Sequence, residues 1–538
     1  MHHLLKKIDF LIKFKNPLYN LFLNRRAVSE ISFIPENLWS ANSENGRKII
    51  EGFLSFHNET IPFDLNTWKT NKSSKLWNEK LHSFSWIHDV RALGTNKARV
   101  FLRQNILQWI ELHDKWDPFN WKNDILSKRI CNIIENISFF YKTADEDFQI
   151  KVARSLNRQA IHLLGSYKRN INVIDKIFIP KAIIISSLSF KNLQKRLELG
   201  IDILAETINS EILNDGMHNS RSPSKHFFFL KSLIDIKNFL GLSNIPIPKP
   251  LNEIISKMGS VLKFFKINNN ELAIFNEYNF VDSLQLNEVI KRSNTKTRIP
   301  SELKSAKFKR VSENKITFIM DCGNPPKEKT HAGTLSFEFS HLGEKLVVNS
   351  GSPFIDDKKW IEAMRSTAAH STVNVDDVNS SDIFFDKDLN NSRIAKVRSE
   401  FYQDKDSFWI NSAHSGYHDF FGIVHNREIH IDTKNLIIRG QDYFSKSNNS
   451  FTNIPKKIFL RFHIHPDIKL NVTTSKKKVF LKLRNNFAWE FICSEPKIII
   501  KDGIYLGTEK TIKKNNHILV SDKFVYEKKI KWLFRLIR

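Results

Sequence analysis

The chain has 538 residues, a length that predicts about two to four domains, and its 43 Phe and 11 Trp exclude a largely disordered protein. Its three Cys are too few and too far apart for a disulfide framework or a cysteine-rich zinc module. Lys and Arg number 83 against 57 Asp and Glu, and the formal net charge of +26 favours an acidic partner: nucleic acid, anionic lipid or an acidic polysaccharide.

Residues 1–33 form a basic amphipathic segment. Apolar residues at 4, 8, 11 and 12 fall on one helical face, and lysines interrupt the run that a secretory signal would need. No uncharged run reaches transmembrane length. The C-terminal KKIKWLFRLIR has similar chemistry, so both ends could contact a membrane surface or dock on the body of the protein. These features predict a cytoplasmic or inner-membrane-peripheral protein, with the periplasm as the alternative.

Residues 34–300 are predicted to form a helical domain. Apolar residues recur at three- and four-residue intervals, with charges between them, in 97–112, 125–141, 148–164 and 193–212. The rhythm of these segments is typical of a stack of antiparallel helical hairpins.

Residues 301–538 change to the alternating pattern of β-strands. In GTLSFEFSHLGEKLVVNSG, Leu335, Phe337 and Phe339 face one way, the polar residues between them face the other, and HLGE turns the chain into a hairpin. NREIHIDTKNLIIRG repeats the pattern with a turn at 432–435. Many short strands joined by turns indicate an antiparallel sandwich. The predicted fold is therefore α+β and multidomain, with helices first and sheets second.

Polar residues gather in DGMHNSRSPSKH, directly before an apolar helix predicted at 227–240. The residues concerned are Asp215, Gly216, His218, Arg221, Pro223, Lys225 and His226. At a helix start, an anionic ligand would meet the positive end of the helix dipole. An ordinary turn with capping side chains explains the same residues.

A second group joins His331, Asn349 and the segment RSTAAHSTVNVD, which contains Arg365 and His370. Two imidazoles and an amide oxygen from different strands could converge on a metal ion or on a substrate carboxylate. Asparagine is a poorer ligand than a carboxylate for a divalent cation, and single histidines in β proteins are more often core or surface groups.

Two further motifs contain histidines. In AHSGYHDFFG, Tyr417 stands beside His414 and His418, an arrangement suited to proton transfer if a nearby cation lowers the pKa of the tyrosine. A tyrosine with an apolar ring and a wet hydroxyl is the alternative. In RFHIHP, His463 and His465 alternate and therefore share one strand face. No phosphate-binding loop, dinucleotide fingerprint, nucleophile elbow or HExxH motif occurs, which disfavours nucleotide-dependent and serine-hydrolase functions.

These motifs together resemble the heparinase II/III family. HAGTLSFEFSHLGEKLVVNSGSPF, RSTAAHSTVNVD, HSGYHDFFGIVHNREIHID and RFHIHP are similar to its C-terminal domain in order and spacing, and SFSWIHDVRALG, SKRICNIIE and DGMHNSRSP to its helical half. The resemblance implies an incomplete α/α toroid followed by an antiparallel β-sandwich, with a basic cleft. It also implies a polysaccharide lyase that cleaves a glycosaminoglycan-like, uronate-containing chain by β-elimination.

The sequence departs from the family at three places. Where active members carry an Asn-His pair, this chain has Asn172-Val173 or Ile174-Asp175, depending on register. Where they carry a Tyr before the His of the S-P-x-Y-H segment, this chain has Lys225. The structural zinc of some members uses His, Asp and His, and the matching residues here are His331, Asn349 and His370. Elimination itself requires no cofactor.

Two hypotheses follow. In the first, the protein is a lyase acting on an acidic polysaccharide of the bacterial envelope, with catalytic groups His218, Tyr417, Lys225 and His414 and substrate-binding groups Arg221, Arg365, His226 and His463. In the second, it is a catalytically degenerate carbohydrate-binding protein of envelope polysaccharide assembly. A third hypothesis, a nucleic-acid or membrane-surface protein, is supported only by the positive net charge of the chain. We therefore expect no specific nucleic-acid partner, and membrane contact only through the basic termini.

Overall fold

The structure is a computed structural model. It describes residues 14–56, 59–69, 73–169, 175–267, 271–277, 280–327, 329–353, 357–383, 392–447, 453–495, 497–508 and 511–537. The chain separates into two compact units, the first made of residues up to Ser210 with Lys231–Glu253, and the second of Glu211–Leu230 with Ile254–Arg538. Within the described ranges, no helix combines the length and the apolarity needed to cross a bilayer.

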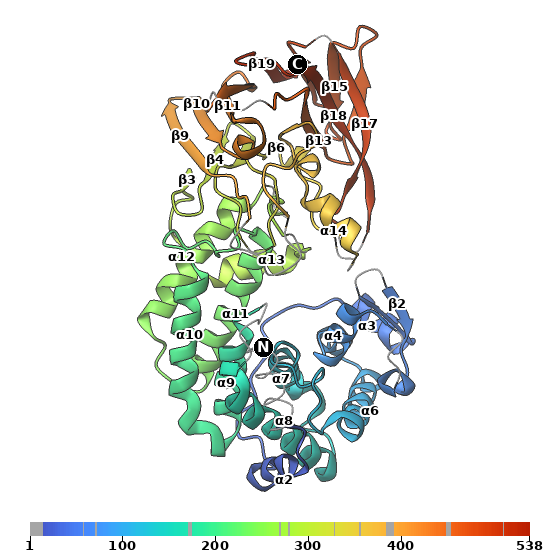
Figure 1. The fold of residues 1–538 in the computed structure, drawn as a ribbon. Helices are drawn as coiled ribbons and strands as arrows, with labels where there is room; N and C mark the ends of the chain where they lie inside the picture. The colour runs from blue at the N-terminus through green and yellow to red at the C-terminus, as the bar shows by residue number, and fades with distance from the viewer. Residues whose placement is uncertain are drawn as a thin grey trace. The chain divides into compact units, whose positions relative to one another are not determined.

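The first unit is helical, and Figure 1 shows its helices succeeding one another along the chain. Local signals fix their starts: the Thr95 side chain caps α6, and Asp145 caps α8, whose first turn is acidic. The helices include α2 (Pro17–Arg26), α3 (Ser43–Ile50), α4 (Lys75–His82), α5 (Ile87–Arg91), α6 (Asn96–His113), α7 (Asn123–Phe140), α8 (Glu146–Ser166), α9 (Phe178–Ser189) and α10 (Leu197–Glu211), and α11 (Pro223–Leu242) runs into this unit from the second. A short hairpin, β1 (Phe53–Phe56) and β2 (Glu59–Pro62), lies among them.

A buried ion triad ties three of these helices together. The Lys181 ammonium of α9 lies 2.6 Å from Glu135 of α7 and 2.6 Å from Asp235 of α11, and all three side chains are buried. Burial raises the pKa of Glu135 to about 7, although Lys181 opposes the shift. The indole of Trp39 also donates to Asp235 at 2.5 Å. The triad therefore links α7, α9 and α11 to one another through the Lys181 ammonium.

The second unit contains two antiparallel sheets, which confirms the predicted order of helices first and sheets second. One sheet has the order β17-β18-β13-β7-β6-β5-β4-β3, with β8 paired to β13; the other has the order β14-β15-β16-β19-β12-β11-β10-β9. The strands of the nine-stranded sheet are β3 (Glu302–Leu303), β4 (Phe308–Glu313), β5 (Ile316–Asp321), β6 (Phe337–His341), β7 (Glu344–Val348), β8 (Val373–Val375), β13 (Lys457–Ile464), β17 (Ile498–Tyr505) and β18 (Lys513–Lys523). Those of the eight-stranded sheet are β9 (Val397–Asp404), β10 (Ser407–His414), β11 (Ile423–Asp432), β12 (Ile437–Lys446), β14 (Lys469–Val472), β15 (Lys478–Lys482), β16 (Ala488–Cys493) and β19 (Ile530–Ile537).

One contiguous apolar core joins residues of both sheets, including Phe337, Ile410, Ile429, Phe462 and Phe534. The predicted hairpin at HLGE is confirmed, because β6 pairs with β7 through His341 and Glu344 around a turn with two positive φ angles. Helices α12 (Lys249–Phe265), α13 (Ser283–Arg292), α14 (Lys358–Arg365) and α15 (His418–Phe421) complete the elements.

A segment without regular structure covers the second face of the nine-stranded sheet. The carbonyl oxygens of Leu272 and Ile274 accept from Lys345 in β7 and from Asn349 directly after it, each at 2.9 Å. The carbonyl of Asn276 accepts from the Ser352 hydroxyl at 3.2 Å. This segment therefore runs along the sheet and delivers the next residue, Glu277, to the loops that follow β5 and β7.

Candidate functional site

The motif DGMHNSRSPSKH forms a tight loop after α10 and the first turn of α11, and its residues belong to the second unit. Gly216 adopts a φ of +90°, a conformation that glycine reaches without steric cost, and its amide donates to Leu213. The Asp215 carboxylate accepts from the backbone amides of Ser305 and Ala306 at 2.8 and 2.7 Å. The loop is thereby pinned to the segment that leads into β4.

Arg221 is the main tie between this loop and the sheet. Its guanidinium donates to the carbonyls of Ala306 (2.9 Å) and Asn324 (2.8 Å) and pairs with the buried carboxylate of Asp321. A Cβ at Gly323 would lie 2.4 Å from this guanidinium, so the close approach requires glycine. Burial raises the pKa of Asp321, and Arg221 opposes the shift. The arginine thus acts on the protein itself, and its predicted role in binding substrate stays a prediction.

Two ammonium groups pair with one carboxylate beside the loop, and a third cation interacts with it at longer range. The Lys225 ammonium lies 2.6 Å from one oxygen of Glu277, and the Lys329 ammonium lies 2.6 Å from the other. Burial would raise the pKa of Glu277, but the two ammonium groups hold it below its usual value, so the carboxylate is ionised. Arg365, at the end of α14, also feels the charge of Glu277. We call Lys225, Lys329, Arg365 and Glu277 the cationic cluster; its formal charge is +2.

Two neutral imidazoles lie next to the cationic cluster. The rings of His331 and His370 meet edge to face, with centroids 5.6 Å apart. Burial holds the pKa of His370 at about 4 and that of His331 well below its usual value, and for His331 the charges of His370, Arg365, Lys329 and Lys225 add to the effect. One nitrogen of His370 bonds the carbonyl of Ser366 at 2.7 Å. Both rings are therefore uncharged at neutral pH.

The residues expected to hold zinc do not fit that metal. Both ends of the Asn349 amide are used within the protein: its nitrogen donates to Ile274 at 2.9 Å and its oxygen accepts from the amide of Ser371 at 3.1 Å. No group of three His, Cys, Asp or Glu side chains with metal-binding geometry occurs in the part of the chain that the structure describes. A zinc site needs about four ligands, and this pair of imidazoles offers two.

The two histidines of the loop itself have structural partners. His226 is fully buried, with one ring nitrogen bonded to the Met258 carbonyl at 2.8 Å and the other accepting from the amide of His218 at 3.3 Å. Burial lowers the pKa of His226 to about 4. His218 bonds the Ser220 hydroxyl at 2.8 Å and lies 3.7 Å from a carboxylate oxygen of Glu211. These contacts shape the loop, and catalytic or binding roles for the two histidines stay predictions.

Tyr417 and His414 lie in the sandwich core, away from the loop. The Tyr417 side chain is 0% exposed, its hydroxyl donates to the carbonyl of Val373 at 2.8 Å, and burial raises its pKa. This is the opposite of the lowered pKa that proton transfer would need. His414 bonds His425 at 3.0 Å, and His425 in turn bonds Asp442 at 2.8 Å. A catalytic role would require the core to open, and the predicted roles of both residues stay predictions.

His463 lies on β13, where it bonds the carbonyl of Ala368 at 2.9 Å and is 3% exposed. The positions 172–174 lie outside the described residues, so the departure from the family's Asn-His pair has no structural account. Sequence reasoning missed Glu277 and Lys329, which stand in stretches without a periodic pattern. Glu277 stands in an Asn-rich stretch that also contains Glu271 and Asp282, so no signal in the sequence set it apart.

A helical unit followed by two antiparallel sheets, with a cationic loop, is the order of domains that the sequence motifs implied. The chain belongs to the heparinase II/III family: residues 47–299 match the family model "Heparinase II/III N-terminus" and residues 295–533 match "Heparinase II/III-like, C-terminal". The resemblance inferred from the sequence motifs is therefore confirmed.

Individual relatives agree with this assignment. FtsZ-localized protein C of Caulobacter vibrioides is 24% identical over 477 residues, which cover 85% of this chain and 82% of that protein. A crystal structure of heparinase III shares the fold with a TM-score of 0.73 at 15% identity, covering 96% of this chain and 89% of that one. A mutant of heparan sulfate lyase HepC from Pedobacter heparinus gives a TM-score of 0.65 at 14% identity, covering 92% and 82% of the two chains.

Proposed function

We propose that this protein binds an acidic, uronate-containing polysaccharide at the cationic cluster and cleaves it by β-elimination. The observation that carries the proposal is the excess of fixed positive charge beside two neutral imidazoles: Lys225, Lys329 and Arg365 face a single ionised carboxylate. Elimination removes the C5 proton of the uronate and breaks the bond from C4 to O4. The proton becomes acidic enough only when the neighbouring carboxylate is neutralised, which the three cations would do.

Roles for proton transfer follow from the protonation states. A neutral imidazole of the His331–His370 pair would accept the C5 proton, and the Lys225 ammonium would donate a proton to the departing O4. No step uses a metal ion, in keeping with the ligand set described above. The reaction would take place at the cell envelope. The name of the Caulobacter relative refers to localisation with FtsZ, which is in keeping with an activity confined to one site in the cell.

Binding without cleavage is the second candidate. Lys225 stands where active members of the family carry a tyrosine, and its ammonium is already paired with Glu277. His331 and His370 are 2% and 5% exposed, and Tyr417 is enclosed in the core. A protein that retains the cations and loses the exposed proton-transfer groups would hold a polyanion without turning it over.

Near-ultraviolet absorbance separates the two candidates, because elimination creates a conjugated C4–C5 double bond. Purified protein is incubated with heparan sulfate, polygalacturonate and alginate, and binding is measured in parallel. A steady rise with one polymer, abolished by the double variant K225Q/K329Q but not by K434Q at the exposed turn after β11, is the expected result. Binding with no rise for any polymer would refute the lyase proposal in favour of the second candidate.

A further inference from the structure

The outer face of the eight-stranded sheet carries a hollow of about 520 Å³, separate from the cationic cluster. Five neighbouring strands line it, in the order β10, β11, β12, β19 and β16. Side chains that point outward from these strands alternate with core residues such as Ile410 and Ile429. The hollow is therefore built by the solvent-facing half of the sheet and belongs entirely to the second unit.

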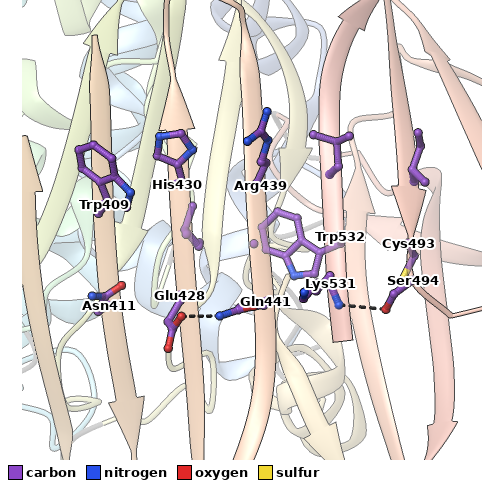
Figure 2. A pocket seen from close by; sticks show the side chains of 14 residues that line it. Trp409, Asn411, Glu428, His430, Arg439, Gln441, Cys493, Ser494, Lys531 and Trp532 are labelled. Carbon is purple, nitrogen blue, oxygen red and sulfur yellow. Dashed lines mark hydrogen bonds between the residues drawn. The ribbon is translucent and has the colours of Figure 1, made fainter. Parts of the chain in front are cut away.

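Strand register places the outward side chains in two parallel rows. Neighbours in the first row pair across the sheet as Trp409↔His430↔Arg439↔Leu533↔Ile492. The second row pairs Asn411↔Glu428↔Gln441↔Lys531 and ends at Ser494, whose hydroxyl accepts from the Lys531 amide at 3.0 Å. Figure 2 shows both rows, with Trp409, His430 and Arg439 side by side above Asn411, Glu428 and Gln441. Five strands at about 4.8 Å spacing make each row roughly 19 Å long.

The first row is an aromatic platform. The rings of Trp409 and His430 lie 4.9 Å apart at 31° to each other, so they present one nearly continuous flat surface. Tyr402 on β9 pairs with Trp409 in the register and is 52% exposed, which extends the row by one strand. Outward positions of a sheet that only face water usually carry small polar or charged residues. A row of Trp, His, Leu and Ile there marks a binding surface.

The second row supplies hydrogen-bonding groups at fixed positions. The Glu428 carboxylate accepts from Gln441 and from the Tyr443 hydroxyl, at 2.8 Å for the latter, so both of its oxygens already have a protein donor. Asn411, Arg439 and Lys531 are exposed and add amide, guanidinium and ammonium donors. With Glu428 counted, the lining carries a formal charge of +1, which suits an anionic rather than a cationic occupant.

We propose that this hollow is a second saccharide-binding site, which holds a segment of an acidic oligosaccharide away from the cationic cluster. The apolar faces of successive sugar rings would stack on Trp409 and His430, their hydroxyls would bond the second row, and Arg439 and Lys531 would meet their acidic groups. The identity of the polymer rests on the proposed function, while the site itself rests on the geometry of this sheet. A rigid row of this length would anchor a long chain, so that the polymer stays attached while another part reaches the cationic cluster.

The test compares the binding of long acidic polymers and of a neutral polymer to matched variants. W409A removes the platform, R439Q removes one cation without touching an aromatic ring, and F480A removes an aromatic from the same outer face outside the hollow. Binding of long heparan sulfate and polygalacturonate should weaken at least about tenfold in W409A, the loss typical of truncating an interface tryptophan, and should not change in F480A. R439Q should weaken the binding of the acidic polymers and leave the affinity for neutral dextran unchanged. This variant still tests the proposal if W409A fails to fold.

Five results distinguish the alternatives. Wild-type affinity in folded W409A and R439Q would overturn the proposal, and so would an equal loss of affinity for DNA, which would indicate simple attraction of polyanions. Dissociation of an oligomer by W409A in sedimentation would also overturn it, in favour of a contact between two copies of this chain. Trp409-dependent binding without any turnover would support this site while refuting the lyase proposal, whereas turnover with Trp409-independent binding would refute this site alone.

Discussion

Replacing Arg221 with Met tests whether this side chain holds the candidate site together. Arg221 is 6% exposed, bonds two carbonyls and pairs with Asp321, which is 5% exposed. Removing the guanidinium leaves a buried carboxylate without its cation, a loss of about 3–5 kcal/mol. The two carbonyls lose donors as well, at about 1 kcal/mol each, although such losses do not add fully. We therefore expect R221M to destabilise the second unit by about 4 kcal/mol.

The loss should depend on pH in a defined direction. Without Arg221, the pKa of Asp321 rises further above its unfolded value, so the folded variant holds a proton that the unfolded chain releases. Stability then decreases as pH rises above the unfolded pKa, and the deficit is larger at pH 8 than at pH 5. D321N removes the buried charge, so the double variant R221M/D321N should recover much of the loss and lose the pH dependence.

Hydrogen exchange of the backbone amides in β4 and β5 under increasing urea reports the free energy of unfolding for this region. A regional probe is needed because a chain with two units need not unfold in one step. R298M, at an exposed arginine of the same unit, is the control and should change stability by less than about 0.5 kcal/mol. A cost below about 1 kcal/mol for R221M, or additive effects of R221M and D321N, would show that the ion pair does not hold the loop.

Three further predictions concern buried groups. Y417F should lower stability by about 1 kcal/mol, the value of one hydrogen bond, and leave polysaccharide turnover or binding unchanged, as measured by absorbance and titration. K181M should destabilise the first unit by about 3–5 kcal/mol, seen in amide exchange of α7, because Glu135 and Asp235 lose their shared cation. The pKa of His226 is about 4 in the folded protein, so between pH 6.5 and 4 the unfolded state binds a proton that the folded state excludes. The free energy of unfolding should therefore fall by roughly 2 kcal/mol from pH 7 to 5. H226Q should remove that contribution.

Each of these has an outcome that contradicts it. Loss of turnover in folded Y417F would place the tyrosine in the chemistry after all. K181M with unchanged exchange would mean that the two carboxylates take up protons at no cost. For the pH profile, H418Q at an exposed histidine serves as the control, and an identical slope in H226Q and the wild type would exclude a contribution from His226.

The alternating pattern predicted which side chains share a face of the sheet but said nothing of what covers the second face. Leu335, Phe337 and Phe339 face the core as expected, and Glu338, on the other face, is 0% exposed as well. The segment over that face bonds through its backbone carbonyls and has no periodic pattern, so the sequence contains no sign of it. Burial there raises the pKa of Glu338 to about 7, a shift that only the three-dimensional cover explains.

The candidate site shows the same division between local and long-range information. The loop motif placed Arg221 before a helix, as the structure has it, but α11 begins at Pro223, four residues earlier than predicted, so Lys225 lies in the first turn of the helix. Their partners Glu277 and Asp321 are 52 and 100 residues away in the chain. Tyr417 was placed among catalytic candidates because histidines flank it, but its ring direction depends on the opposite sheet.

Binding a polyanion and transferring a proton place different demands on the same loop. Binding needs only net positive charge within reach of the polymer, and the cationic cluster keeps that charge even though Glu277 neutralises part of it. Proton transfer needs in addition a group that can reach the departing O4, and the Lys225 ammonium must leave the Glu277 carboxylate to do so. E277Q separates the two demands: it raises the formal charge of the cluster from +2 to +3 and frees the Lys225 ammonium. If the cluster serves binding alone, affinity should rise with no turnover in either protein, whereas a change in the pH profile of turnover would assign Lys225 to the chemistry.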